Sequence, residues 1–292
     1  MTGSETDEPN ELCRICRIGV QQRVYVKNGH DILRCNACGT GRAVARDFDP
    51  ARYYTGEYFE GGHDDGYADY GGTGAVLRAE FERLSGRLQR IAPTGGDLLE
   101  VGCAYGYFLT TAQQHWRVHG LEISADAVAR CHAAGLAGVR RGMAEAAELA
   151  PLPELQAIVM LDVIEHLPDP EAFLSACRDK LVSGGVLMLT TGDFGSPLAR
   201  LMGKRWRLMT PPQHLWFFTA RGFRVLAARQ GWDVLTVEHP TKRVPLSLIR
   251  YQLQRMAGLK PRRDAGGGGI GIPVNLGDAM LVALRRPLER AA

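Results

Sequence analysis

Four cysteines near the N-terminus have the spacing of a metal site. Their order is C-x2-C-x18-C-x2-C, and its members are Cys13, Cys16, Cys35 and Cys38. Two C-x2-C pairs at this separation are typical of a tetrahedral zinc site, which four thiolates close, so that the metal is structural. Disulfides, a redox role and an incidental cluster are the alternatives, and a reducing compartment disfavours disulfides. Residues 23–26 and 32–34 favour short strands, so we expect a zinc ribbon over residues 13–46.

A glycine turn follows the apolar segment Leu98–Val101, which has the composition of a buried strand. Gly102 and Gly106 allow the backbone to turn tightly and to approach a ligand closely, and a helix that begins after them offers unpaired N–H groups. A dinucleotide site has the pattern G-x-G-x-x-G. The spacing here is G-x-x-x-G, with Ala104 where a middle glycine would stand. A tight turn without a ligand is the alternative.

Two glutamates narrow the class of ligand. Glu122 ends the next apolar segment, where a carboxylate accepts hydrogen bonds from both hydroxyls of a ribose. Glu100, directly before the turn, suits the cationic amino group of a bound amino acid. Together they specify a nucleoside that carries an amino acid and has no pyrophosphate. S-adenosylmethionine has this composition.

Polar groups also follow the apolar segment 157–161, namely Asp162, Glu165 and His166. In one interpretation they shape the wall around the methionine end of the cofactor, and His166 is hydrogen-bonded inside the protein. In the other, the carboxylate at position i and the carboxylate–imidazole pair at i+3 and i+4 converge on a divalent cation, provided that the loop makes one helical turn.

His214 lies in an apolar segment directly after two prolines and a glutamine. It could be a general base, because a histidine pKa of about 6.5 suits proton abstraction at neutral pH, or a further metal ligand, or a packed histidine. Asp193, just past the segment 186–190, is the next candidate base, and His166 is the third. The reaction would be an in-line displacement, in which the protein positions the nucleophile behind an activated methyl group and removes its proton.

These groups depend for their positions on an alternation of strands and helices. Helical periodicity begins at Thr73. Strands are expected at 97–101, 117–122, 138–141, 157–161, 186–190, 233–238 and 279–284, and helices after Gly106, from Ser124 to Gly135, from Asp169 to Val182 and after Thr219. The alternation predicts a doubly wound, mostly parallel α/β sheet, with ligands beyond the carboxyl ends of its strands.

Four segments occur in the order found in a known family. They are Glu100–Gly106, Gly120–Ser124, Met160–Leu167 and Gly184–Leu187. They resemble motifs one, two, four and post-four of class I S-adenosylmethionine-dependent methyltransferases, over about residues 73–286. The resemblance implies a Rossmann-like, seven-stranded sheet whose last strand, residues 279–284, is antiparallel. The cofactor-binding residues that it implies are Glu100, Gly102, Cys103, Ala104, Gly106, Glu122, Ile123, Ala144 and Asp162.

The resemblance also bears on two details of the site. Many relatives carry an aspartate against the adenine where this chain has Ala144, so the contact would come from the backbone or from Glu145. The segment from Asp162 to His166 is similar to the Glu-x-x-Glu-His metal site of ubiquinone-type O-methyltransferases and small-RNA 2′-O-methyltransferases, with Asp162 in place of the first glutamate. This implies a divalent cation at Asp162, Glu165 and His166.

The remaining segments complete the expected organisation. Residues 1–12 form a disordered lead, residues 47–72 a lid or linker loop, and residues 73–292 a methyltransferase domain with substrate-cap insertions at 192–218 and 241–272. Within the second insertion, Val244–Met256 has a helical pattern and residues 264–271 are nearly all glycine. The aromatic residues around Trp206 and Phe218 are expected to enclose a small-molecule pocket.

The composition is that of an ordinary globular protein, with 45% apolar and 23% charged residues and a net charge of +3. The chain lacks an apolar run long enough for a membrane span, and its acidic first residues lack the features of a signal peptide, so we expect a cytoplasmic protein. We expect it to methylate a small-molecule acceptor, a hydroxyl of a sugar or natural-product scaffold, because the ribbon resembles those of bacterial methyltransferases that act on sugars and secondary metabolites. The oligomeric state is left open.

Two other functions are considered. Some rRNA base methyltransferases also carry a ribbon, and this one is basic, with Arg14, Arg17, Arg23, Lys27, Arg34, Arg42 and Arg46 against Asp31 alone. The expected lid and apolar segment favour a small molecule over nucleic acid. A non-catalytic protein with a degenerate cofactor site is the third possibility, and the intact Glu100, Gly102 and Glu122 oppose it.

Overall fold

The computed structural model describes residues 10–45, 48, 50–53, 74–246, 249–250, 254 and 271–289. Most of the expected lead (1–12), nearly all of the expected lid loop (47–72) and nearly all of the glycine-rich segment (264–271) lie outside the described residues. The chain forms two compact units. The first unit comprises Met1–Phe48, Met160–His239 and Leu276–Ala292, and the second comprises Asp49–Val159 and Pro240–Asn275.

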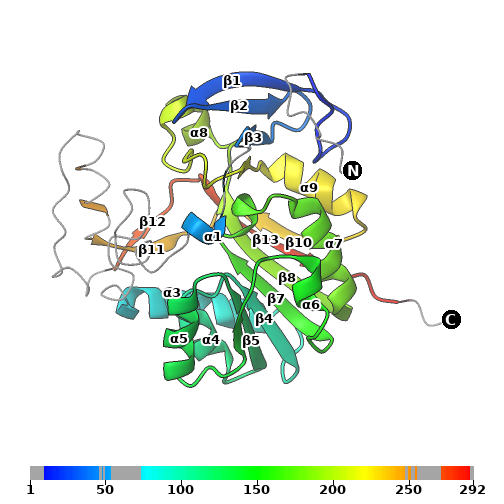
Figure 1. Cartoon of the computed structure of the whole chain (residues 1–292), viewed down its shortest axis with the longest axis vertical. Helices are drawn as coiled ribbons and strands as arrows, with labels where there is room; N and C mark the ends of the chain where they lie inside the picture. The colour runs from blue at the N-terminus through cyan, green and yellow to red at the C-terminus, as the bar shows by residue number, and fades with distance from the viewer. Residues whose placement is uncertain are drawn as a thin grey trace. The chain divides into compact units, whose positions relative to one another are not determined.

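A seven-stranded sheet has the strand order β10-β13-β8-β7-β4-β5-β6 (Figure 1). Its strands are β4 (Asp97–Val101), β5 (Arg117–Glu122), β6 (Val139–Arg141), β7 (Leu155–Leu161), β8 (Leu181–Gly192), β10 (Asp233–Glu238) and β13 (Ala279–Arg285). Strands β4, β5 and β6 are parallel, whereas β13 is antiparallel to both β8 and β10. The doubly wound fold and the antiparallel last strand are therefore confirmed.

The helices of the second unit are α1 (Pro50–Tyr53), α3 (Gly74–Gln89), α4 (Tyr107–Ala112), α5 (Ala125–Ala133) and α6 (Ala146–Leu149). Helix α3 packs on α4, with the rings of Phe81 and Phe108 edge to face. Helix α5 begins at the expected cap, because the Ser124 side chain accepts a hydrogen bond from the N–H of Ala127.

A two-stranded hairpin also belongs to the second unit. Strand β11 (Lys242–Pro245) pairs antiparallel with β12 (Gly271–Val274). The expected helix Val244–Met256 is therefore wrong at its first two residues, because Val244 and Pro245 pair across the hairpin with Ile272 and Gly271, partners that lie far along the chain.

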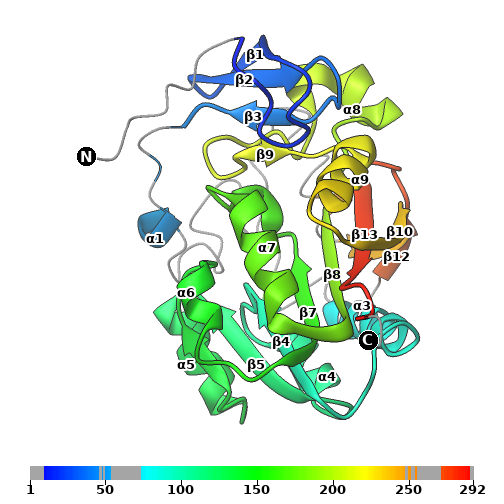
Figure 2. The same cartoon turned by 90° about the vertical axis from the view of Figure 1, so that its right-hand side faces the viewer.

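The first unit places two helices where the sequence predicts them, α7 (Pro170–Lys180) and α9 (Ala220–Arg229). Asp169 caps α7 through the N–H of Ala172, and Thr219 caps α9 through the N–H of Gly222, at 2.9 Å each. In this unit β13 lies between β8 and β10 (Figure 2). A short 3-10 turn, η1 (Ile164–His166), follows β7.

A second sheet in the first unit has the order β1-β2-β3-β9. Strands β1 (Gln21–Lys27), β2 (His30–Cys35) and β3 (Gly41–Ala43) belong to the cysteine segment, and β9 is Trp216–Phe217. The segment 192–218, which we expected to be a substrate-cap insertion, contains β9 and two short helices, α8 (Pro197–Met202) and η2 (Gly203–Arg205). Figure 1 shows α8 beside β1 and β2.

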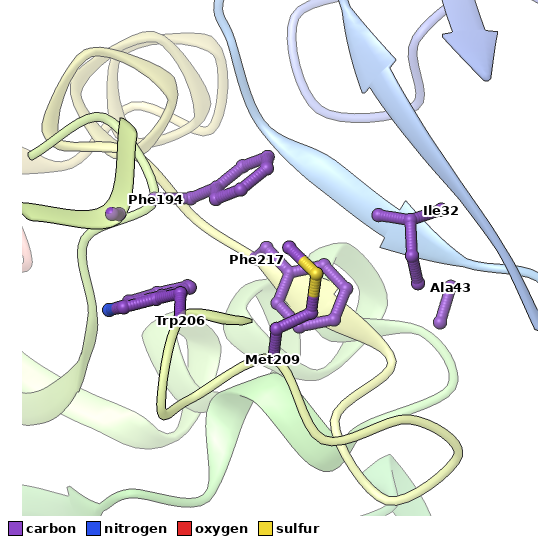
Figure 3. Packing of buried hydrophobic residues seen from close by; sticks show 7 residues of the cluster. Ile32, Ala43, Phe194, Trp206, Met209 and Phe217 are labelled. Atoms are coloured by element: carbon purple, nitrogen blue, oxygen red, sulfur yellow. The ribbon is translucent and has the colours of Figure 1, made fainter. Parts of the chain in front are cut away.

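Aromatic side chains join this segment to the cysteine strands. The rings of Trp206 and Phe217 lie against that of Phe194, with centroids 5.8 and 5.7 Å away. Met209 lies beside Phe217, and Ile32 and Ala43 approach from the strands (Figure 3). Trp206 and Phe217 are each only 2% exposed. The expectation that aromatic residues here line a small-molecule pocket is therefore wrong for these two, because burying such large apolar surfaces stabilises a core shared with the ribbon.

No helix among the described residues combines the length and the apolar character needed to cross a membrane.

Candidate active site

The turn after β4 adopts the left-handed conformation at three positions, Gly102 (φ 69°), Ala104 (φ 47°) and Gly106 (φ 72°). A side chain at Gly106 would also meet Leu136, whose Cδ1 atom would lie 2.3 Å from the new Cβ. Glycine is therefore required at Gly106 both by the backbone and by the neighbouring side chain. Ala104 adopts the same region at the cost that a Cβ imposes there.

We expect the substitution Gly106→Ala to lower the free energy of unfolding by about 2–3 kcal/mol, because it adds a steric clash to a left-handed backbone. Urea denaturation measures the change. Gly135→Ala is a matched control, since Gly135 has φ 84° but a Cβ added there would meet no atom within 4 Å. It should lose only about 1 kcal/mol. Equal losses in the two variants would show that the contact with Leu136 is unimportant.

Glu122, at the end of β5, forms hydrogen bonds that connect the glycine turn to β5. One carboxylate oxygen accepts a hydrogen bond from the N–H of Ala104 at 2.8 Å, and the other from the N–H of Ser124 at 2.9 Å. Burial raises the pKa of this carboxyl group, and the backbone donors oppose the increase. The arrangement positions a carboxylate beside the turn, where the sequence predicted the ribose-binding group.

Glu100, in β4, is a buried acidic group of the second unit. The residue is 3% exposed, and its Oε2 atom has no hydrogen-bond partner among the described residues. Burial raises the pKa of Glu100 well above its usual range, and the Cys131 and Glu122 side chains raise it further. A buried carboxyl group with an unsatisfied oxygen is costly, and a cationic amino group placed there would satisfy it.

Other residues predicted to bind the cofactor also lie in the second unit. Cys103 is buried in the turn, and its neighbour Cys131, together with burial, raises the pKa of its thiol. Ile123 is half-buried after β5, and Ala144 lies half-buried in the bend between β6 and α6. Because β4, β5 and β6 are parallel, these residues follow the carboxyl ends of neighbouring strands.

The first unit brings together Glu165, His166 and His214. One ligand atom from each lies within 4.8 Å of the other two. The two histidine rings meet edge to face with centroids 4.6 Å apart. His166 Nδ1 contacts the carbonyl of Gln213 at 2.8 Å, and His214 Nδ1 contacts the carbonyl of Leu208 at 2.7 Å. Because a carbonyl can only accept, Nδ1 carries the proton in both rings and Nε2 carries the lone pair.

Both rings are neutral in this environment. Burial lowers the pKa of His166, and burial together with the neighbouring His166 ring lowers the pKa of His214 to about 3. A neutral imidazole with Nδ1 bonded to a carbonyl is the form in which histidine binds metals. The group thus has the donor chemistry of a divalent-cation site, with two imidazoles and one carboxylate.

The metal trio expected from the sequence differs from this one. Asp162 is not part of the group, and its Oδ1 atom accepts a hydrogen bond from the Thr190 hydroxyl at 2.8 Å. His214 takes the third position instead. The short 3-10 turn places Glu165 and His166 side by side, whereas the proximity of His214 depends on a segment 48 residues later in the chain.

Asp193 contacts a histidine that the sequence did not single out. Its Oδ2 atom lies 2.8 Å from Nε2 of His239, which directly follows β10. His239 could have been identified from the sequence by its position. It comes just after an expected strand, at the same end of the predicted sheet as Asp193.

The four cysteines of the ribbon converge, and none of the seven cysteines, all of them described, forms a disulfide. The sulfur atoms of Cys13 and Cys38 are 3.8 Å apart, and those of Cys16 and Cys35 are 3.6 Å apart. A tetrahedral zinc ion with Zn–S bonds of about 2.3 Å requires sulfur–sulfur distances of about 3.8 Å. The residues present therefore fit a zinc ion.

Comparison with known proteins agrees with this geometry. Residues 76–237, more than half of the chain, match a family described as "Methyltransferase domain". The chain belongs to this methyltransferase family. It is an S-adenosylmethionine-dependent methyltransferase with a Rossmann-like fold.

The methyltransferase is similar to two proteins named ubiquinone biosynthesis O-methyltransferase. It is 31% identical to that of Cereibacter sphaeroides over 172 residues, which cover 54% of this chain and 67% of the relative. It is 32% identical to that of Dinoroseobacter shibae over 102 residues, which cover 32% of this chain and 40% of the relative. The matches thus span part of each relative's length.

The fold is also found among solved structures. A chain in the complex between the Haloferax volcanii Trm112 methyltransferase activator and its methyltransferase superposes with a TM-score of 0.52, at 14% identity, over 77% of this chain and 98% of that one. At this identity the similarity establishes the shared fold.

Proposed function

We propose that the methyltransferase transfers the methyl group of S-adenosylmethionine to a hydroxyl group of a small aromatic molecule. The buried Glu100 is the observation that supports S-adenosylmethionine as the methyl donor. Its unsatisfied oxygen belongs to the residue just before the left-handed turn, and Glu122 accepts a hydrogen bond from that turn. The similar proteins support the choice of acceptor, because their name describes an O-methyltransferase of ubiquinone biosynthesis. They favour an aryl hydroxyl over the sugar or natural-product hydroxyl that the sequence suggested.

The residues of the second unit would hold the donor. Each oxygen of Glu122 already accepts one backbone N–H and retains a lone pair for a ribose hydroxyl. Glu100 would accept the cationic amino group, and the turn from Gly102 to Gly106 would allow the close approach of the cofactor backbone. The bound cofactor supplies a methyl group that its sulfonium already activates, so the protein has to orient an acceptor and remove a proton.

We propose further that Glu165, His166 and His214 hold a divalent cation. Of the three roles that the sequence left open for His214, metal ligand fits best, because a side chain with a pKa of about 3 is a weak base at neutral pH. The cation would polarise the acceptor oxygen.

Replacing His214 with alanine removes one ligand of the proposed cation. It should therefore weaken Mn²⁺ binding at least tenfold and slow turnover at least tenfold. The affinity for S-adenosylmethionine should not change. Calorimetry with Mn²⁺ alone and a labelled-methyl assay measure these effects. Asp162→Asn is the matched control, because Asp162 lies outside the group of three. Unchanged Mn²⁺ affinity in His214→Ala, or a loss only in Asp162→Asn, would contradict the assignment.

We propose that the four ribbon cysteines hold a structural zinc ion. The sulfur distances support this, as do backbone N–H groups directed at the sulfur atoms, from Gly19 to Cys16 and from Ala37 and Cys38 to Cys35. Such N–H contacts stabilise thiolates.

The alternative of RNA methylation is weakened by the partners of the ribbon's basic residues. Arg17 pairs with Glu171 and Arg23 with Asp31. Arg34 lies over the ring of Phe194, and Arg42 is buried over Trp216. Arg34 and Arg42 thus contribute to the protein's own packing. The side chains of Arg17 and Arg23 are 59% exposed, but each already has a carboxylate partner that a phosphate would have to displace.

A labelled-methyl assay with three acceptors tests the function. Transfer to 3,4-dihydroxybenzoate supports the proposal, whereas transfer only to a methyl glycoside or only to ribosomal RNA would replace it with the sugar or the RNA alternative. Binding of S-adenosylmethionine by calorimetry without transfer to any of the three would favour the non-catalytic alternative.

A further inference from the structure

A carboxylate and a histidine form a pair in the first unit, and neither belongs to the metal group or to the glycine turn. Asp193 follows β8 and His239 follows β10, and their side chains meet at 2.8 Å. Both strands run antiparallel to β13, which lies between them (Figure 2). They therefore run parallel to each other and end at the same edge of the sheet, the edge at which α/β folds of this type bind their ligands.

The structure holds Asp193 in one position. The residue is 5% exposed. Its Oδ1 atom accepts hydrogen bonds from the N–H groups of Gly195 at 2.8 Å and Ala220 at 3.4 Å, while Oδ2 is directed at His239. The donor from Ala220 belongs to the first turn of α9, so both a loop and a helix orient the carboxylate.

This contact determines the tautomer of His239. A carboxylate only accepts hydrogen bonds, so Nε2 of His239 carries the proton and Nδ1 carries the lone pair. A histidine backed by a fixed carboxylate is the arrangement by which enzymes orient a general base.

The His239 ring is also accessible to solvent, because 35% of its side chain is exposed. A general base has to return its proton to solvent after each turnover, and a partly exposed ring can do so.

We propose that His239 is the general base of the transfer and that Asp193 is its positioning residue, an inference that rests on the proposed hydroxyl acceptor. The acceptor O–H bond breaks and its proton moves to Nδ1 of His239. The oxygen forms a bond to the methyl carbon, and the carbon–sulfur bond breaks with its electron pair on sulfur, which converts the sulfonium to the thioether of S-adenosylhomocysteine. His239 then releases the proton to water.

The kinetic test uses His239→Ala, Asp193→Asn and an exposed control, His115→Ala. With 3,4-dihydroxybenzoate, His239→Ala should lower kcat about 10²- to 10⁴-fold, with S-adenosylmethionine affinity unchanged, and added imidazole should restore part of the rate. Asp193→Asn should lower kcat more than KM, because an amide N–H directed at Nε2 moves the proton to Nδ1. A wild-type kcat in His239→Ala overturns the proposal.

A second measurement does not depend on turnover. In full-length protein labelled with ¹³C-histidine and saturated with S-adenosylhomocysteine, the His239 signal is identified by its loss in His239→Ala. Adding 3,4-dihydroxybenzoate should shift this signal in the wild type and not in Asp193→Asn. If the wild type shows no methyl transfer but the signal shifts, the proposed reaction fails while the site stands. A His239 signal that does not respond overturns the inference.

Discussion

Replacing Cys38 with serine is expected to release zinc and to lower the melting temperature by about 10 °C or more. A structural zinc ion stabilises its fold by many kcal/mol, so that losing even about 5 kcal/mol would produce such a shift. The effect should spread beyond the ribbon, because the Cys38 carbonyl accepts a hydrogen bond from Thr219, whose side chain also caps α9. Strand β9, which pairs with β3, would lose its partner as well.

Zinc content by elemental analysis and melting by circular dichroism measure the two effects. Cys177→Ser is the matched control, since Cys177 is also fully buried but lies in α7, outside the group of four cysteines. It should keep one equivalent of zinc and lose only about 1–3 kcal/mol from its buried hydroxyl. A Cys38→Ser protein with a full equivalent of zinc and a wild-type melting temperature would contradict the assignment.

The second large effect is expected at Glu100. Replacing it with glutamine should weaken S-adenosylmethionine binding about 10- to 100-fold, because a hydrogen bond between two charged groups contributes about 1.5–3 kcal/mol. Burial raises the pKa of Glu100, so the free protein holds this group protonated at pH values at which an ordinary glutamate is ionised. The cationic cofactor prefers the carboxylate. Wild-type affinity should therefore increase as pH rises through the raised pKa, and binding should release a proton.

Titration calorimetry in buffers of different ionisation enthalpy measures both the affinity and the released proton. A range of about pH 5 to pH 7.5 stays below the pH at which the amino group of the cofactor titrates. In Glu100→Gln the pH dependence and the proton release should disappear. Glu154→Gln, at an exposed position before β7, is the control and should retain both. An affinity in Glu100→Gln equal to that of the wild type would rule out a contact between Glu100 and the amino group.

Several elements could be predicted from the sequence because local patterns specify them. Strands β4, β5 and β10 have the bounds that apolar segments predicted, and the caps at Ser124 and Thr219 begin their helices. Strand β8 is longer than expected, Leu181–Gly192 instead of 186–190. Gly184 and Gly185 interrupt the apolar pattern, but their backbones bond with Arg286 and the strand continues through them.

Elements that depend on distant partners could not be predicted in this way. Strand β9 has only two residues, too few for a periodic pattern, and it forms because β3 supplies its hydrogen bonds. Large aromatic residues such as Trp206 and Phe217 occur both in pocket linings and in cores. Here they belong to a core, because Ile32 and Phe194 pack beside them.

The four ribbon cysteines, the glycine turn and its two glutamates were determined by the sequence alone, because their chemistry depends on residue type and short spacing. The tertiary structure decided the partners of the histidines. His214 lies beside Glu165 and His166, and His239 lies beside Asp193, because strands and loops far apart in the chain end at the same places. No local pattern contains that information, since it arises only when the sheet has formed.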